Sequence, residues 1–160
     1  MNISKFTQKS VQAVQDLEKV AYEYGNQEIE QEHLLYTLLT QEDSLILKLI
    51  EKMEINKEYF LNTVKNALDA KVKVSGGELR FGQYLNKALV NAEDEAKAMG
   101  DEYVSVEHLF LALLKYPSPS MKKIWSEFGI TKERFLQALS TVRGLSLIHI
   151  SEPTRRVVIS

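Results

Sequence analysis

The chain contains no cysteine, no strong excess of charge of either sign, and no apolar run close to the roughly 20 residues that span a membrane. The lack of cysteine excludes disulfides, thiol catalysis and cysteine-ligated zinc, and it fits a reducing compartment. The start of the chain does not carry the apolar run of a signal peptide. A formal net charge of −2, with both signs interspersed, leaves no basic stripe for a phosphate backbone. We therefore expect a soluble, cytoplasmic protein that binds neither nucleic acid nor membrane.

What the sequence does contain is an internal duplication. Residues 6–64 align without a gap to residues 81–139 at a constant offset of 75. Residues that recur at this offset include Phe6 and Phe81, Gly25 and Gly100, Glu32 and Glu107, His33 and His108, and Phe60 and Phe135. A constant offset over this length indicates one supersecondary unit used twice. Because an open solenoid needs about three repeats, two copies predict a closed body with a pseudo-twofold axis.

Each repeat is predicted to form four helices, which makes the fold class all-α, with two tandem four-helix repeats. In the first helix, over residues 7–24, apolar residues recur three and four apart, Thr7 is a suitable N-cap, and Gly25 suits a left-handed residue after the last turn. Gly82 replaces this threonine in the second repeat, which predicts a weaker start. The second helices, at 32–39 and 107–114, are rich enough in leucine to be buried on most sides. The third helices are expected at 45–53 and, after a helix-breaking Pro-Ser-Pro segment, at 121–128, and the fourth begin near Asn56 and Thr131.

The domain organisation follows from the same alignment. Repeat one covers about 1–70, repeat two about 79–144, and the glycine-containing segment at about 71–78 is the linker between them. Residues 145–160 have no counterpart in the repeat and no helical period. We interpret them as foreign, vector-derived sequence that follows a truncation.

Residues 1–144 resemble the double Clp N-terminal domain of the bacterial Clp/Hsp100 AAA+ unfoldases. The resemblance rests on Phe6-Thr7-Gln8, the turn at 25–29, the Glu-His-Leu helix starts at 32 and 107, the Gly129-Ile130 turn, and the closing Val142-Arg143-Gly144. Among the branches of the family, the ClpB-type disaggregases are most similar, and the protease-associated ClpC and ClpA types are the alternative.

The resemblance implies a substrate-recognition module tethered to ATPase rings, with unfolded or aggregated polypeptide, and in the alternative adaptor proteins, as partners. It also implies that ATP and Mg²⁺ belong to ATPase domains outside this chain, where the family assembles as a hexamer and works with an Hsp70 system. No G-x-x-x-x-G-K-[ST] motif occurs in the sequence. The fragment by itself is expected to be a monomer without catalytic activity.

The resemblance also implies candidate binding residues. In ClpB-type domains a threonine at the start of the first helix and two acidic residues of the second repeat are associated with chaperone function, and Thr7, Asp101 and Glu107 match these positions. Structural roles compete: a helix cap for Thr7, a turn for Asp101, and a helix-dipole partner for Glu107. In ClpC-type domains the glutamate of each Glu-His motif is associated with phosphoarginine recognition, and Glu32 and Glu107 match. Gly82 departs from the ClpC-type pattern, because it stands at the position that corresponds to Thr7 and so one hydroxyl of the symmetric pair is missing.

A polypeptide-binding surface should expose apolar side chains where the halves meet, because unfolded chains are recognised largely by apolar contact. The candidates are Phe6, Phe81, Tyr84, Leu85 and Tyr103. Phe6 and Phe81 recur at positions where a residue packs back on its helix, which favours core packing for this pair. Tyr84 is replaced by a lysine in the first repeat, which favours exposure.

The recurring Glu-His pair suggests two further functions, metal binding and catalysis. His33 and His108 have no ligand cluster at metal spacing, so they are interpreted as buried histidines that satisfy backbone groups. For Glu32 and Glu107 as general acid and base, no nucleophile or oxyanion donor is identifiable. An enzyme would hold one of these glutamates in a deep polar pocket with a shifted pKa. We predict no catalytic residue, no metal and no cofactor site in this chain.

Overall fold

The computed structural model describes residues 3–143, and within them the chain is mostly α-helical. The first repeat contains the 3-10 helix η1 (Ile3–Lys5), α1 (Gln8–Gln15), α2 (Leu17–Glu23), the short strand β1 (Glu28–Ile29), α3 (Gln31–Thr40), α4 (Leu45–Lys52) and α5 (Lys57–Asp69). The second contains the short strand β2 (Arg80–Phe81), α6 (Gln83–Ala98), α7 (Val106–Lys115), α8 (Pro119–Phe128) and α9 (Lys132–Arg143). The all-α prediction is confirmed, and both repeats contain the four expected helices, the first of which is divided into α1 and α2 in repeat one.

The first helix of each repeat begins and ends as local chemistry requires. The hydroxyl of Thr7 accepts a hydrogen bond from the Ser10 N–H at the start of α1, whereas Gly82 offers no side chain to cap α6. Gly25 and Gly100 end the two units at φ +71° and +75°, a conformation that costs glycine little. The expectation of one continuous helix over 7–24 was wrong at Asp16, where ψ of −8° tilts the next peptide out of the α-helical ladder and separates α1 from α2.

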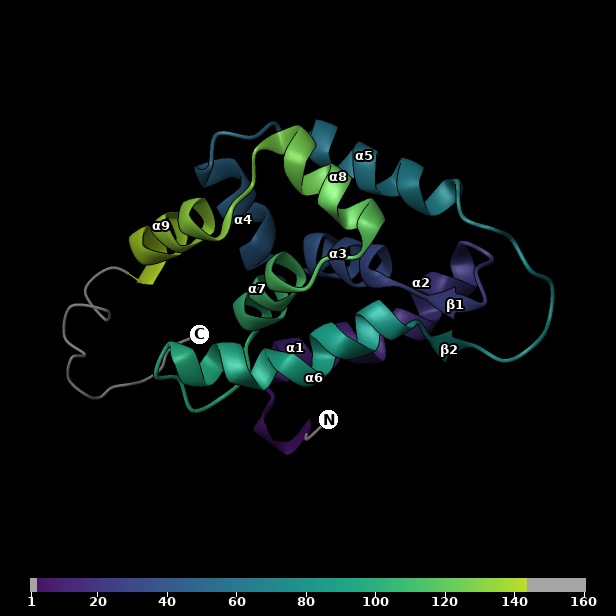
Figure 1. The fold of residues 1–160 in the computed structure, drawn as a ribbon, viewed down its shortest axis with the longest axis horizontal. Helices are drawn as coiled ribbons and strands as arrows, with labels where there is room; N and C mark the ends of the chain where they lie inside the picture. Colours follow the sequence, from purple (N-terminus) through teal and green to yellow (C-terminus); the bar gives the residue numbers. More distant parts are fainter. Residues whose placement is uncertain (1–2, 144–160) are drawn as a thin grey trace.

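The centre of the molecule is formed by the two leucine-rich helices, α3 and α7. In Figure 1 they lie between α6 and α1 on the lower side and α5 and α8 on the upper side. Phe110 of α7 stacks on Phe135 of α9, with ring centroids 4.5 Å apart, and meets Trp125 of α8 edge-on. Each repeat therefore packs its other helices around its own Glu-His helix, as the apolar patterning predicted.

The two halves are joined by a pair of equivalent backbone contacts. Strands β1 and β2 pair in parallel, with Ile29 opposite Phe81, and an isolated parallel bridge pairs Val104 with Phe6. Subtracting the offset of 75 from Phe81 and from Val104 gives Phe6 and Ile29, so each bridge is the counterpart of the other. Each repeat thus sends the segment before its first helix across to the segment before the other repeat's Glu-His helix. This reciprocal exchange is what a pseudo-twofold relation produces.

The connections between the helices were predicted only in part. Pro119 does not break a helix but occupies the first turn of α8, where its missing N–H costs nothing, and Ser118 caps this helix. The linker at 71–78 is non-helical and is fastened to repeat one, because the Val74 N–H donates to the Gly25 carbonyl and the Asn26 side chain donates to the Val72 carbonyl. The interpretation of 145–160 as vector-derived sequence falls outside the described residues.

Candidate functional site

Both recurring histidines close the start of a buried helix. The Glu30 N–H donates to Nδ1 of His33 at 2.8 Å, and the Ser105 N–H donates to Nδ1 of His108 at the same distance. With Nδ1 accepting, Nε2 carries the proton in each ring. His33 then donates to the Asn26 side chain at 2.9 Å, and His108 donates to Asp101 at 2.8 Å. All four ring nitrogens are therefore occupied by protein groups, which agrees with the structural interpretation of the pair rather than with metal binding.

The residue beside each histidine is a buried carboxylate. Glu32 in α3 and Glu107 in α7 are both almost fully buried in the first turn of their helix, where the helix dipole favours negative charge. Burial of an ionised carboxylate is costly unless a cation and hydrogen bonds compensate it. Each glutamate has such a cation, supplied from the end of its own repeat.

In repeat one the cation is Lys71, the second residue after α5. Its ammonium lies 3.3 Å from Glu32 and 3.2 Å from Glu30, and the hydroxyl of Ser120 donates to Glu32 from α8 of the other repeat. Burial and, as the second cause, the positive charge of Lys71 together lower the pKa of the neighbouring His33 to about 4. The imidazole of His33 is consequently neutral at physiological pH.

In repeat two the cation is Arg143, at the end of α9. Its guanidinium contacts Glu107 at 2.6 Å and Asp101 at 2.9 Å. Burial by itself would raise the pKa of Asp101, but hydrogen bonds from His108 and Arg143 outweigh it and hold the pKa below its usual range. For Arg143 burial works toward a lower pKa, and the two carboxylates reverse this and raise it. The structure thus places Glu107, His108 and Arg143 in one network with the partly buried Asp101.

This geometry supports a structural role for the carboxylates and not the chemistry of an enzyme. Neither glutamate lines the open surface hollow at the turn between α4 and α5, which is formed by residues such as Glu51, Ile55 and Asn56. Within the same residues no group of three or more His, Cys, Asp or Glu side chains could hold a metal ion. No helix of this part of the chain is long and apolar enough to cross a bilayer.

Thr7 sits at the other contact between the halves. Its N–H donates to the Val104 carbonyl at 2.9 Å, and the Ser10 hydroxyl donates to the same carbonyl at 2.7 Å. The threonine is therefore both the cap of α1 and a neighbour of the segment that follows Tyr103. Asp101 and Glu107 belong to the network around Arg143, so the three predicted residues lie in two places rather than one.

The apolar candidates divide between surface and core. Tyr84 and Tyr103 are exposed by 42% and 53%, as a contact surface requires. The expectation that Leu85 is exposed was wrong, because it lies on the inner face of α6 and is fully buried. Phe6 is buried, as expected, but the core placement of Phe81 was also wrong, because Phe81 is 36% exposed.

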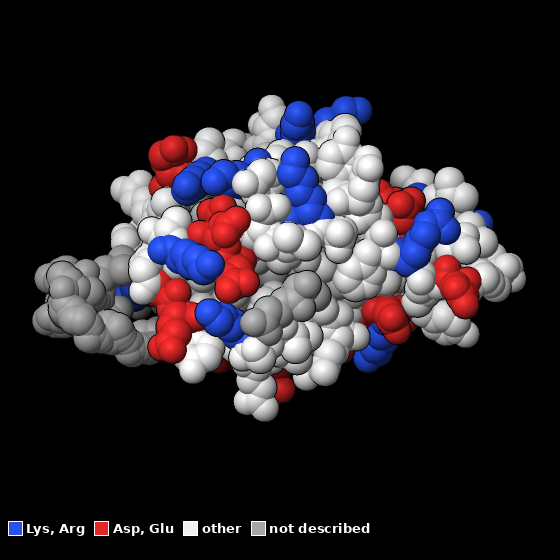
Figure 2. Space-filling model, turned by 60° about the horizontal axis from the view of Figure 1, so that its bottom comes forward, with Lys and Arg blue, Asp and Glu red and all other residues white. Residues whose placement is uncertain are grey.

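The exposed candidates, together with the exposed Ile3, which the sequence did not single out, belong to elements on one side of the molecule. Ile3 of η1, Phe81 of β2, Tyr84 of α6 and Tyr103 before α7 lie in segments along the lower side in Figure 1. Figure 2 turns this side toward the viewer and shows a largely uncharged central area between groups of acidic and basic side chains. This side, defined by Ile3, Phe81, Tyr84 and Tyr103, is called the apolar face below.

Sequence reasoning missed three polar residues of the site. Lys71 was assigned to a linker, and Arg143 was noted only as part of the closing Val-Arg-Gly. Gln31 is fully buried and joins the halves: its amide donates to the carbonyls of Tyr84 and Tyr116 and accepts from the Ser118 N–H. One signal in the sequence could have pointed to the two cations: a buried acidic residue in each repeat requires a positive charge nearby.

Comparisons with known proteins agree with this architecture. The model of the Clp repeat (R) N-terminal domain matches residues 5–128. The chaperone protein ClpB of Nitratidesulfovibrio vulgaris is 37% identical over 159 residues, which cover 96% of this chain and 18% of the relative. The chain therefore spans less than a fifth of the length of that relative.

Solved structures show the same fold at lower identity. The Hsp104 N-terminal domain from Candida albicans superposes with a TM-score of 0.75 at 22% identity, covering 88% of this chain and 92% of that one. A ClpV N-domain in complex with a VipB peptide superposes with a TM-score of 0.67 at 19% identity, covering 88% of each chain. Together with the duplicated four-helix unit, the match of the family model over most of the sequence establishes that this chain belongs to the Clp repeat N-terminal domain family of the Clp/Hsp100 chaperones.

Proposed function

We propose that this chain is the substrate-recognition domain of a ClpB-type, ATP-dependent protein disaggregase, and that it binds unfolded or aggregated polypeptide on the apolar face. The observation that carries the proposal is the exposure of Tyr84 and Tyr103 on one side of a domain whose relatives are ClpB chaperones. Aromatic side chains that remain in water beside an uncharged surface are typical of contact sites. A ClpV N-domain of the same fold is known with a bound peptide, which also supports binding by this architecture.

The longer protein is expected to supply the remaining activities. We infer ATPase domains that bind ATP and Mg²⁺, a hexamer formed through them, and cooperation with an Hsp70 system, because the chain spans only 18% of a ClpB relative. The isolated chain is then a non-catalytic monomer. The lack of cysteine supports the cytoplasm as its compartment.

The alternative is an N-domain of ClpC or ClpA type that binds adaptors or phosphoarginine through Glu32 and Glu107. The geometry supports it less well, because both carboxylates are buried against internal cations and Gly82 stands where a second threonine would be needed. Titration with free phosphoarginine separates the two proposals. Binding that is lost in Glu32→Ala and Glu107→Ala would favour the alternative.

The proposed function is tested by binding of a permanently unfolded protein. We expect fluorescently labelled, reduced and carboxymethylated α-lactalbumin to raise its anisotropy on addition of the 160-residue chain, and native α-lactalbumin to give little response. A Tyr84→Ser/Tyr103→Ser variant should weaken binding roughly tenfold, because two exposed aromatic contacts are removed.

A matched control variant is available in the same chain. Tyr22 and Tyr59 are exposed tyrosines of α2 and α5, outside the apolar face, and Tyr22→Ser/Tyr59→Ser should leave the affinity unchanged. Equal losses in the two double variants would mean that any exposed tyrosine contributes, and would contradict binding at the apolar face. An equal response to unfolded and native α-lactalbumin would contradict the function itself.

A further inference from the structure

Phe6 and Phe81 are equivalent residues of the two bridges between the halves. In each bridge the partner residue bonds to the neighbours of the phenylalanine and not to the phenylalanine itself. After Phe81, Gly82 donates to the Ile29 carbonyl at 2.8 Å, and after Phe6, Thr7 donates to the Val104 carbonyl at 2.9 Å. In a parallel ladder the residue between two bonded neighbours points its own N–H and C=O away from the partner strand. Phe6 and Phe81 therefore present the same outward-facing backbone groups.

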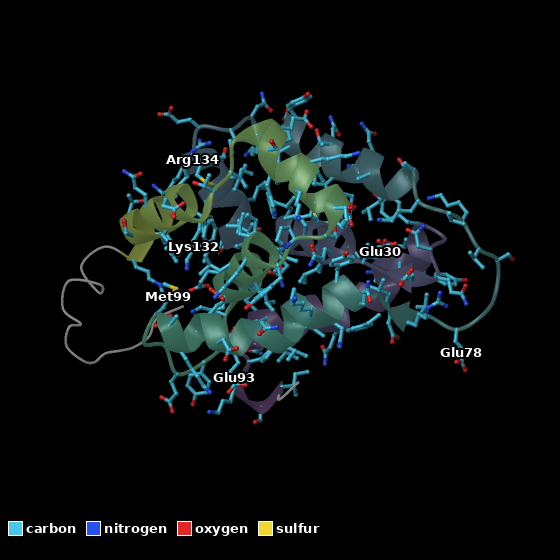
Figure 3. All side chains as sticks on the ribbon, viewed as in Figure 1. Glu30, Glu78, Glu93, Met99, Lys132 and Arg134 are labelled. Carbon is cyan, nitrogen blue, oxygen red and sulfur yellow. The ribbon has the colours of Figure 1, made fainter. Side chains whose placement is uncertain are left out.

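Repeat one covers its outward-facing group with its own chain. The Phe6 N–H donates to the Ile3 carbonyl of η1 at 3.0 Å, and the ring of Phe6 is only 8% exposed. An ion pair of 3.8 Å between Lys5 and Glu93 connects η1 to α6, and Figure 3 shows Glu93 on the lower side of that helix, toward η1. The molecule thus contains an example of how this edge is closed.

Repeat two leaves the equivalent group open within residues 3–143. No hydrogen bond from the Phe81 N–H is formed with any of these residues, and Phe81 is 36% exposed next to the exposed Tyr84. The chain before Phe81 does not turn back as η1 does. It passes through Gly76 and Gly77, both at positive φ, and Glu78 projects from the outer loop in Figure 3.

We propose that the Phe81 edge of β2 binds a short extended segment of a client polypeptide. A carbonyl of the client accepts the Phe81 N–H, as the Ile3 carbonyl accepts the Phe6 N–H, and an apolar client side chain packs on Phe81 and Tyr84. This inference rests on the proposed function and specifies the form of the substrate. Main-chain pairing at a sheet edge recognises a chain largely independently of its sequence, which suits a domain with many clients.

The size of the edge argues for a client rather than for a second copy of the domain. Strand β2 has two residues, and its exposed aromatic neighbourhood consists of Phe81 and Tyr84. A stable dimer buries roughly 800 Å² on each partner, which is more than such an edge provides. An unfolded chain, in contrast, has unpaired carbonyls along its whole length and needs only a local contact.

The inference is tested by amide hydrogen exchange, measured by NMR on the 160-residue chain. In the free chain we expect the Phe81 N–H to exchange quickly and the Phe6 N–H to be protected by its bond to Ile3. On saturation with reduced and carboxymethylated α-lactalbumin, exchange at Phe81 should slow about tenfold, while exchange at Phe6 should not change. Phe6 serves as the matched internal control.

A side-chain variant provides a second measurement. Phe81→Ser should weaken binding of the same unfolded protein about fivefold, because an exposed aromatic contact is lost. Tyr22→Ser, at an exposed residue of α2 outside the apolar face, should leave binding unchanged. Exchange in the unmodified chain remains decisive if Phe81→Ser does not fold.

The outcomes separate this inference from the proposed function. Binding with unchanged exchange at Phe81 would overturn the edge-pairing inference and leave polypeptide binding intact. Protection of the Phe81 N–H already in the free chain would overturn it as well, because the edge would then be closed. Absence of binding would overturn the proposed function together with the inference.

Discussion

The two repeats keep the same backbone plan but complete it with different groups. In repeat one Glu32 is compensated by Lys71, which lies just beyond the last helix, whereas in repeat two Glu107 is compensated by Arg143, the last residue of α9. His33 donates to the neutral Asn26, and its counterpart donates to the charged Asp101. The duplicated fold therefore fixes which buried carboxylates and histidines need a partner, and each repeat supplies that partner with a different residue type.

The difference extends to the bridges between the halves. The Phe6 bridge is buried under η1, and its equivalent at Phe81 is exposed. The open bridge lies in repeat two, which also supplies Tyr84 and Tyr103 of the apolar face. Repeat one thus closes its bridge, whereas repeat two leaves its bridge open and supplies three of the four residues of the apolar face.

The largest expected effect is a difference in stability between variants of Phe6 and Phe81. Phe6→Ala should lower the free energy of unfolding by about 3–4 kcal/mol, because it leaves a cavity in the core. Phe81→Ala should cost less than about 1 kcal/mol, because its side chain is already partly in water. Guanidinium unfolding followed by circular dichroism measures both. Equal losses would mean that the bridges are energetically alike despite their different burial.

The second prediction compares the two buried carboxylates. Glu107→Ala should lower the free energy of unfolding by about 3 kcal/mol, because it removes one of the two carboxylates that compensate a buried guanidinium. Glu32→Ala should cost about 1–2 kcal/mol, because the Lys71 ammonium is closer to water and retains Glu30. The control is Glu107→Leu/Arg143→Leu, which removes both charges and should recover most of the loss. A double variant as unstable as Glu107→Ala would contradict the ion-pair explanation.

The third prediction concerns pH and repeat one. The folded-state pKa of His33 is lowered to about 4, so the unfolded chain binds the proton first as the pH falls below about 6.5. Stability is therefore fully present above pH 6.5 and is lost toward pH 4, with about 2 kcal/mol lost between pH 7 and pH 5. Urea unfolding across this range measures the slope. His33→Asn should flatten it, and an unchanged slope in this variant would assign the effect to other groups.

The smallest effects compare the two helix starts. Thr7→Ala should cost about 1 kcal/mol through loss of the cap on α1. Gly82→Thr copies the sequence of repeat one into repeat two but should gain less than about 0.5 kcal/mol. A Cβ atom at Gly82 would lie 3.1 Å from the Glu28 carboxylate and 3.3 Å from the Ile29 carbonyl, so crowding opposes the new cap. Thermal unfolding measures both, and a full 1 kcal/mol gain at Gly82 would show that Glu28 moves away freely.

Much of the fold was predictable because the deciding interactions are local. The caps at Thr7 and Asn56 and the left-handed glycines after the first helices depend on neighbours within a few residues. The break at Asp16 and the use of Pro119 as a helix start were not predicted, because both depend on backbone angles that several residue types can adopt. The sequence identified Thr7, Asp101 and Glu107 as candidates but not their partners.

The sequence by itself determined the duplication, the helices and the positions where each helix begins, since helical period and capping act over three or four residues. Tertiary structure alone decided which phenylalanine is buried, that Leu85 faces inward, and which cation reaches each carboxylate. The contact of Arg143 with Asp101 joins residues 42 positions apart, and that of Ser120 with Glu32 joins residues 88 apart. Contacts at such separations depend on how the helices and the two repeats pack. The residue pattern that recurs at an offset of 75 does not itself decide whether the bridge at Phe6 or the bridge at Phe81 is the buried one.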